Sequence, residues 1–495
     1  MKKSRKSTKK IIIIGGGIGG LATAALLAKQ GHQVTLLEKN SQIGGRASVW
    51  RSKGFTFDMG PSWYLMPDVF EHYFSLFKKK PSDFYSLTRL DPQYRVYFGK
   101  NDFIDIAKDL KTNLELFESL ETQASKKIED YLNRAKIDYK AALKYILYNN
   151  FTGIKDYLNK DLMREGRRMR LFESLDHYTK RFTKNQRIQQ ILQYTIVFLG
   201  GSPKNTPAFY SIMSHIDFNL GVYYPDKGIY SIIQALQTLC TSYGVTIETG
   251  AEVKKICVTD AKVTGVRTAK GTYSADIVIS NADYAFTETH LLDRKQQSYP
   301  ESYWKKKTIA PSAFLIYLGV KGKVKNVSHH TLSFANNWQD HFEEIFKNPK
   351  WPNKPSYYVC CPSKTDPTVA PKNHENLFIL VPVAAGISDT DTQRSKYASK
   401  IIKDFEKLIG ESISDRIVTQ RIFSQRDFMS EYNAHTGTAL GLAHTLTQTA
   451  HLRPSITSKK VKNLFYVGQY TQPGIGMPMC LIAAELVSKE VDLHA

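Results

Sequence analysis

The chain is poor in cysteine and has no long uninterrupted apolar run. Its five cysteines among 495 residues form no CxxC pair and show no zinc-ligand spacing. The missing spacing predicts no structural metal, and the low, odd cysteine count indicates a reducing compartment. No segment offers the roughly 20 apolar residues that a membrane-spanning helix needs. We therefore expect a protein that is not integral to a membrane.

Acidic residues are outnumbered by basic ones, 46 against 68, which leaves a net charge of +22. This balance suits nucleic acid or an anionic lipid surface as a partner. The sequence has no zinc finger, RNA-recognition signature or basic-leucine pattern, so we expect no nucleic-acid binding. The remaining explanations are attraction to an anionic membrane surface and a simple gain in solubility.

The length and composition indicate an ordinary folded protein. With 42% hydrophobic residues over 495 positions, the chain exceeds one hydrophobic core, which predicts two or three subdomains. No internal repeat is visible. The basic first ten residues are predicted to be disordered.

Residues 11–38 have the pattern of a complete dinucleotide-binding βαβ unit. A short apolar strand leads into Gly15, Gly17 and Gly20, which satisfy GxGxxG, and Glu38 follows about 20 residues later. The glycines allow a tight turn, close approach of the backbone to a pyrophosphate, and close helix–strand packing. The expected elements are strands at 11–14 and 34–37 and a helix at 21–30. The unit therefore predicts binding of an adenine dinucleotide.

The same residues allow one competing interpretation. A basic decapeptide followed by eighteen uncharged residues, 11–28, is similar to a secretory signal. A signal has no reason to hold three glycines at phosphate-binding spacing before a second strand and an acid, so we favour the βαβ unit.

Two further glycine-containing segments extend the cofactor prediction. Gly45 and Arg46 follow Glu38, and the turn at 58–62 is suited to a pocket floor; in this order they favour a flavin over a nicotinamide. Near the other end, Gly468 ends an apolar strand, and a turn with Gly474, Gly476 and Pro478 precedes a helix predicted at 481–491. Free N–H groups near Met477 could face the flavin and stabilise its reduced, negatively charged form.

The middle of the chain divides into helical and mixed segments. Residues 105–200 are predicted to be mainly helical, with an apolar stripe from Ile128 to Ile146 and a basic cluster at Arg164, Arg167, Arg168 and Arg170. A basic amphipathic region can lie on an anionic bilayer, although a solvated helix face is the simpler reading of each helix. From residue 228 the α/β pattern returns. Cofactor-type segments at both chain ends imply a domain assembled from distant pieces.

These motifs together resemble the bacterial carotenoid (phytoene- or diapophytoene-type) desaturases, FAD-dependent oxidoreductases related to amine oxidases. The resemblance runs over nearly the whole length and includes GGGIGG, EKNSQIGGR, GFTFDMGPSWYLMPDVF, GVYYPDKGIYSIIQAL, ADIVISNADY and the C-terminal turn. Where many members have a THPG-type turn, this chain has TQPG at 471–474. By position, the resemblance implies FAD contacts at Gly15, Gly17, Gly20, Glu38, Gly45, Arg46, Val253, Gly468 and Met477.

The resemblance also implies the architecture and the reaction. It predicts an α/β fold with a Rossmann-like FAD-binding domain at 1–110, 205–295 and 422–495, a helical membrane-facing region at 111–204, and a mixed α+β substrate domain at 296–421. The expected reaction is desaturation of a long isoprenoid such as phytoene or diapophytoene. The electron acceptor would be oxygen or quinone, and the location would be cytoplasmic, peripheral on the inner face of the membrane.

Several alternatives stay open at this point. A carotenoid isomerase or oxidase and an amine oxidase share the family pattern, and prenyl-lipid escort proteins such as Rab GDP-dissociation inhibitors share the fold without binding flavin. The sequence nominates no catalytic acid or base. His435, His444 and His451 lie near the flavin segment, where packing roles are expected. The oligomeric state is left open.

Overall fold

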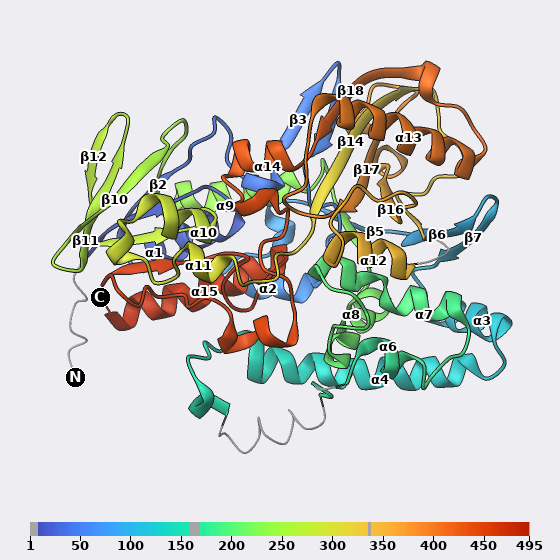
Figure 1. Ribbon diagram of the computed structural model, residues 1–495, viewed down its shortest axis with the longest axis horizontal. Helices are drawn as coiled ribbons and strands as arrows, with labels where there is room; N and C mark the ends of the chain where they lie inside the picture. Colours follow the sequence, from blue (N-terminus) through green and yellow to red (C-terminus); the bar gives the residue numbers. More distant parts are fainter. Residues whose placement is uncertain (1–7, 158–168, 172, 335–337, 495) are drawn as a thin grey trace.

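The computed structural model describes residues 8–157, 169–171, 173–334 and 338–494. Figure 1 shows two sheet-containing lobes side by side, with a layer of helices below the second lobe. The first lobe contains a five-stranded parallel sheet in the order β19-β13-β1-β2-β9, and the second a seven-stranded sheet in the order β18-β14-β17-β16-β15-β6-β7. The segments that position the candidate site come from both sheets.

The strands have the following bounds: β1 Lys10–Ile14, β2 Gln33–Leu37, β3 Val49–Ser52, β4 Phe55–Asp58, β5 Leu87–Arg89, β6 Tyr94–Gly99, β7 Asp102–Ile106, β8 Tyr223–Pro225, β9 Thr246–Glu248, β10 Val253–Thr259, β11 Lys262–Thr268, β12 Gly271–Ser274, β13 Ile277–Ser280, β14 Ser312–Lys321, β15 His330–Ser333, β16 Tyr357–Cys360, β17 His374–Val383, β18 Ile417–Phe423 and β19 Leu464–Tyr466. The helices have these bounds: α1 Ile18–Lys29, α2 Pro67–Ser75, α3 Leu110–Leu120, α4 Ala124–Ala142, α6 Leu175–Thr179, α7 Gln186–Gln193, α8 Ile212–His215, α9 Tyr230–Ser242, α10 Tyr284–Phe286, α11 Glu301–Trp304, α12 Trp338–Phe346, α13 Asp391–Ile409, α14 Gln425–Tyr432 and α15 Met477–His494.

The parallel sheet is buried on both faces because its central strand is apolar at every position after Lys10. Ile11 and Ile13 pack with α1, α9 and α15, whereas Ile12 and Ile14 pack with β10, β11 and α10. Successive side chains of a strand point to opposite faces, so one run of four isoleucines contributes to two cores. The predicted βαβ unit is confirmed, with α1 beginning three residues earlier than expected, directly at the glycine turn.

The two chain ends meet in this lobe. β13 pairs with β1 on one side and with β19 on the other, all in parallel register. The C-terminal helix α15 packs against α1, and Ser488 Oγ lies 3.2 Å from Gln30 Oε1. Strands from residue 10 to residue 466 therefore belong to one sheet.

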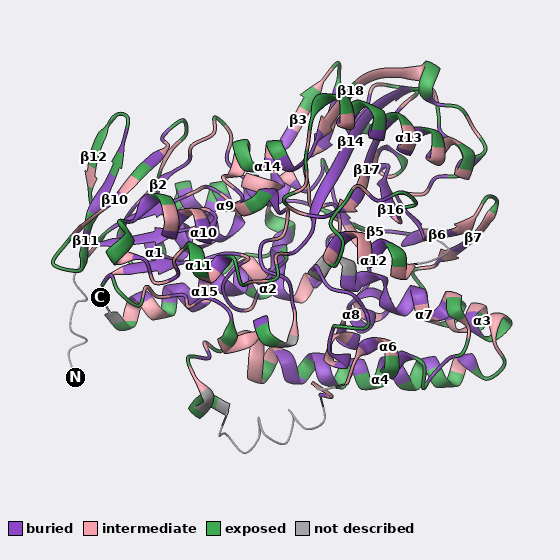
Figure 2. Ribbon diagram, in the orientation of Figure 1, coloured by how far each residue is buried: buried purple, intermediate pink, exposed green. Residues whose placement is uncertain are grey.

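The second sheet separates two cores. Along β14, Phe314, Ile316 and Leu318 pack under α13, whereas Ala313 and Leu315 belong to the core on the other face. Figure 2 shows β14 and β17 buried along most of their length. Residues 94–106, which the sequence analysis placed in the cofactor domain, form β6 and β7 of this second sheet, because β6 pairs in parallel with β15. The domain boundary predicted at residue 110 therefore does not separate the first sheet from the second, because β6 and β7 lie before it.

The expected helical region is present where the structure describes it. On α4, Ile128, Tyr131 and Ala135 of the predicted stripe are fully buried. Ile128 and Tyr131 belong to the core that also contains Ala313 and Leu315 of β14. Arg164, Arg167 and Arg168 lie outside the described residues. Arg170 is used internally, since its Nη2 contacts Asp138 at 2.9 Å and its guanidinium lies over Tyr178. Within the described residues, every helix is too short or too polar to cross a bilayer.

Candidate functional site

One cavity of about 890 Å³ joins the two lobes. Its lining runs from the glycine turn after β1, past β14 and β17, to α12, and also reaches α4 and α8. Every predicted cofactor residue except Gly20 lines this cavity, including Val253 at the start of β10. Segments more than four hundred residues apart in the sequence thus share one hollow.

The glycine turn is shaped for close backbone approach. Gly15 has a φ of +96°, which L side chains rarely adopt, and a Cβ on Gly17 would lie 2.9 Å from Asn281 Nδ2. Gly20 faces inward instead, where a Cβ would lie 2.1 Å from the carbonyl oxygen of Gly15. Gly20 therefore serves helix–strand packing, which is the third role of the fingerprint, rather than the wall of the cavity.

Glu38 stands at the end of β2 facing the same turn. Its Oε2 accepts a hydrogen bond of 2.7 Å from the Gly16 N–H, and its Oε1 accepts one of 2.8 Å from Asn40. Burial raises the pKa of Glu38, and these N–H groups act in the opposite direction. The carboxylate is thus held in place with lone pairs left for the two hydroxyls of a ribose.

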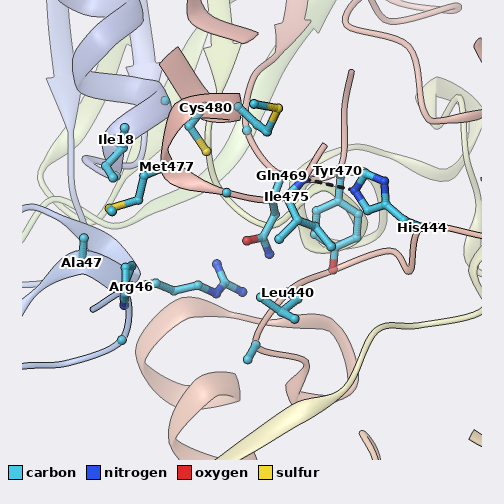
Figure 3. Close-up of a pocket in the computed structure, with 18 of the residues that line it drawn as sticks. Ile18, Arg46, Ala47, Leu440, His444, Gln469, Tyr470, Ile475, Met477 and Cys480 are labelled. Atoms are coloured by element: carbon cyan, nitrogen blue, oxygen red, sulfur yellow. Dashed lines mark hydrogen bonds between the residues drawn. The ribbon is translucent and has the colours of Figure 1, made fainter. Parts of the chain in front are cut away.

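The cavity wall contains buried donors that have no acceptor among the described residues, and two of them face each other. They are Arg46 Nε and Gln469 Nε2, and Figure 3 shows both side chains pointing into the same space. The guanidinium of Arg46 lies over the ring of Tyr432, and its Nη2 reaches the Thr438 carbonyl only at 3.4 Å. An unpaired buried donor is costly, so the pair fits a bound group rich in acceptors.

The C-terminal turn closes the cavity on the opposite side. Gly468 (φ +120°) ends the segment after β19, and α15 begins at Met477, whose helix offers N–H groups without intrahelical acceptors. Figure 3 places Met477, Ile475 and Tyr470 around the hollow. The ring of His444 supports this turn. The Ile475 N–H contacts His444 Nε2 at 3.3 Å, and a Cβ on Gly474 would lie 2.4 Å from the same ring.

The buried Arg453 holds this turn through main-chain oxygens. Its Nε contacts the carbonyls of Tyr470 and Thr471, and its Nη2 contacts that of Gln469 at 2.6 Å. Burial lowers the pKa of Arg453 to about 10, which leaves it charged at neutral pH. A buried positive charge beside this turn favours a negatively charged group in the cavity.

These features fit FAD. The glycine turn, the fixed Glu38 carboxylate, the unpaired donors of Arg46 and Gln469, and the N-terminus of α15 supply complementary groups for a ribose, a pyrophosphate and a ring with carbonyl oxygens.

Sequence reasoning missed several residues of the site. Asn281 packs against the glycine turn and its Nδ2 donates to the Gly15 carbonyl at 3.3 Å. Asp283 accepts hydrogen bonds from the Tyr470 hydroxyl at 2.7 Å and from the His435 N–H at 3.2 Å. Both follow β13 in the motif ADIVISNADY, so their place after a buried strand was the available signal.

The three histidines that lie near the flavin segment in the sequence differ in their relation to the cavity. His444 and His451 line the cavity, and His444 Nδ1 lies 2.8 Å from the Tyr210 hydroxyl. Burial lowers the pKa of His444 well below its usual value, so the ring is neutral. His435 is not among the lining residues. With its hydrogen bonds to Tyr210 and Ile475, His444 supports the turn.

Comparisons with known proteins agree with a flavin cofactor. A model of the flavin containing amine oxidoreductase family matches residues 18–492. The chain is 47% identical to a carotenoid 3,4-desaturase of Haloarcula japonica, covering 97% of each chain. It is 32% identical to a zeta-carotene-forming phytoene desaturase of Myxococcus xanthus, covering 98% of this chain and 94% of the relative. The fold is also similar to an oxidoreductase from Methanosarcina mazei, with a TM-score of 0.64 at 18% identity over 97% and 100% of the chains.

The chain therefore belongs to the flavin-containing amine oxidoreductases, and its cofactor is FAD. Within that family it is a member of the carotenoid desaturases, because full-length relatives above 30% identity carry that name. It is an FAD-dependent oxidoreductase, which overturns the alternative of a flavin-free escort protein.

Proposed function

We propose that this enzyme removes two hydrogens from adjacent carbons of a long isoprenoid polyene of the carotenoid class. The observation that carries the proposal is the single cavity in which the cofactor groups continue into a wall of apolar side chains. That wall includes Leu315, Leu380 and Phe428. A long apolar molecule can bury its surface against such a wall, whereas a small polar amine cannot.

The chain's own residues have positioning and shielding roles in this reaction. FAD, when bound, supplies the oxidising ring that takes up the hydrogen. Trp63 packs on His330 with ring centroids 4.1 Å apart. The rings of Trp63, Tyr94 and Tyr194 contact one another at centroid distances of 5.2–6.1 Å, so this part of the wall is a rigid aromatic surface. Such a surface holds a polyene in one orientation and keeps water away from the reacting carbons.

The position of the reacting bond is a finer part of the proposal. The carotenoid 3,4-desaturase is 47% identical to this chain, whereas the phytoene and diapophytoene desaturases are 31–32% identical. We therefore favour the 3,4 bond of an already extended carotenoid, with phytoene and diapophytoene as the competing substrates.

Co-expression tests the proposal. The gene is expressed with synthases that make thirty- or forty-carbon precursors, and separately with enzymes that supply an extended polyene whose 3,4 bond is saturated. We expect a red shift in the absorption of the extracted pigment, largest with the extended polyene. Unchanged pigment in all three strains would contradict desaturation. A product of equal mass but altered geometry would indicate an isomerase, and an added oxygen atom would indicate an oxidase.

Purified enzyme separates the remaining alternatives. Anaerobic mixing with substrate bleaches the flavin if the enzyme oxidises it, and re-oxidation by oxygen or by a soluble quinone then identifies the acceptor. Bleaching by primary or polyamines instead of the polyene would favour an amine oxidase.

We also propose a peripheral location on the inner, cytoplasmic face of an anionic membrane. The support is the water-insoluble substrate class, the net charge of +22, and Leu452, which lines the cavity and is 44% exposed. Each basic residue near an anionic surface contributes about 1 kcal/mol. The protein should float with anionic liposomes at low salt and not with neutral ones, and Leu452→Asp should reduce flotation. Protein that stays in the soluble fraction would contradict this location.

A further inference from the structure

A second group of potential ligand side chains lies behind the aromatic wall. His330 begins β15 and Cys360 ends β16, and the two residues are register partners in this antiparallel pair. A ring nitrogen of His329, a ring nitrogen of His330 and the Cys360 sulfur lie within 4.8 Å of one another. All three residues are buried, with exposures of 4%, 0% and 2%.

Each imidazole has one nitrogen in use and one without a partner. His329 Nδ1 contacts the Thr365 hydroxyl at 2.7 Å, and His330 Nδ1 contacts the Tyr358 hydroxyl at 2.7 Å. The Nε2 atoms of both rings are buried without a hydrogen-bond partner among the described residues. Metal-bound histidines have this arrangement, in which the second nitrogen is held by an outer partner that fixes the ring.

We propose that His329, His330 and Cys360 form a buried binding site for a metal ion of the zinc class. Two imidazoles and one thiolate are ligands that Zn²⁺ prefers, usually in a tetrahedral site. The thiol gives up its proton when the metal binds, so the bound ion and its ligands carry a net charge of +1.

The surroundings can complete such a site. A small separate hollow of about 10 Å³ borders Cys360, Tyr224 and Asp58, which is close to the room that one water molecule needs. The Tyr224 hydroxyl is buried without a partner, and the Tyr224 ring lies 4.6 Å from the His329 ring. This hydroxyl or a water in the hollow can be the fourth ligand, and the carboxylate of Asp58 offsets the remaining positive charge.

The site is structural and does not depend on the proposed function. It would join the start of β15 and the end of β16 through side chains, directly behind Trp63, which stacks on His330. A search for zinc spacing in the sequence misses it because the ligands come from a His–His pair and a cysteine thirty residues later, brought together by strand pairing.

The test is metal analysis of the full-length, flavin-containing protein. After growth with zinc and desalting, we expect about one zinc per chain. X-ray absorption at the zinc edge should show one sulfur neighbour at about 2.3 Å and nitrogen neighbours at about 2.0 Å. This measurement needs no variant, so it remains decisive if a substitution prevents folding.

Two neighbouring cysteines provide a matched pair of variants. Cys360→Ser should lose zinc, and Cys361→Ser should keep it, because Cys361 is equally buried but contacts Ser363 and Glu375 instead. The flavin spectrum of each variant checks its folding. Wild-type protein that holds no metal after one equivalent of Zn²⁺ or Cu⁺ is added would overturn the proposal. Zinc without a sulfur neighbour, or equal zinc content in Cys360→Ser and wild type, would also overturn it.

Discussion

The Gly16 N–H donates a hydrogen bond of 2.7 Å to Glu38 Oε2, which joins the glycine turn to the end of β2. This bond fixes the carboxylate at the cavity wall before any cofactor arrives. A carboxylate that is already held in place loses less conformational entropy when the cofactor binds than a mobile side chain does. The relationship therefore gives Glu38 a structural role, and we expect the same carboxylate to bind the cofactor.

Glu38→Ala should weaken FAD binding. Loss of hydrogen bonds to a charged group costs about 1.5–3 kcal/mol, which corresponds to roughly a ten- to hundredfold rise in Kd. The measurement is a titration of apoprotein with FAD by fluorescence quenching, well below the melting temperature. Glu115→Ala is the control, because this carboxylate is exposed on α3. Binding within twofold of wild type would show that Glu38 does not contact the cofactor.

Gly20→Ala should damage folding and flavin retention although Gly20 does not line the cavity. The added Cβ would meet the Gly15 carbonyl oxygen at 2.1 Å, so the turn must shift. Overpacking of this kind costs about 1–3 kcal/mol. Gly153→Ala is the control, since a Cβ there meets nothing within 4 Å. Thermal melts and the flavin-to-protein absorbance ratio measure the effect, and equal values for both variants would contradict it.

Asp217 should make stability fall with rising pH. Burial raises the pKa of Asp217 to about 7 from 3.8, and its Oδ2 accepts hydrogen bonds from the hydroxyls of Tyr94 and Tyr194. Between these pH values the folded chain keeps a proton that the unfolded chain releases. This contribution is therefore full below about pH 4, falls by about 1.4 kcal/mol per pH unit up to pH 7, and is lost above it.

Asp217→Asn should flatten that dependence between pH 4 and 7. Urea unfolding at several pH values measures the slope, with the exposed Asp130→Asn as the control. If the profiles of wild type and Asp217→Asn run parallel, Asp217 is ionised in the folded protein and the prediction is wrong.

Filling the cavity should block the polyene but spare the cofactor. Ala313 lies on β14, is 5% exposed and lines the cavity. Ala313→Trp should reduce desaturated product at least about tenfold, since pocket contacts discriminate strongly by size. Ala313→Val should have a smaller effect. Flavin content should stay unchanged in both variants, so a loss of flavin would assign this part of the cavity to the cofactor instead.

The cofactor half of the site was predicted from local sequence patterns. Gly15, Gly17, Glu38, Gly45 and Arg46 lie in one βαβ unit and the loop after it, where spacing along the chain decides spacing in space. Asn281 and Asp283 were missed because each is an ordinary polar residue until β13 pairs beside β1. Gln469 was missed for the same reason. Its Nε2 can be recognised as a cofactor donor only when the structure shows it unpaired and facing Arg46.

By itself, the sequence determined the dinucleotide fold, the flavin and the family, because periodicity, glycine spacing and a single acid act over short chain distances. Only the tertiary structure decided that β6 and β7 join the second sheet, that one cavity connects both lobes, and that His329, His330 and Cys360 come together. These relations depend on strand pairing and packing between segments far apart in the chain, and no local pattern encodes which distant partner a strand will choose.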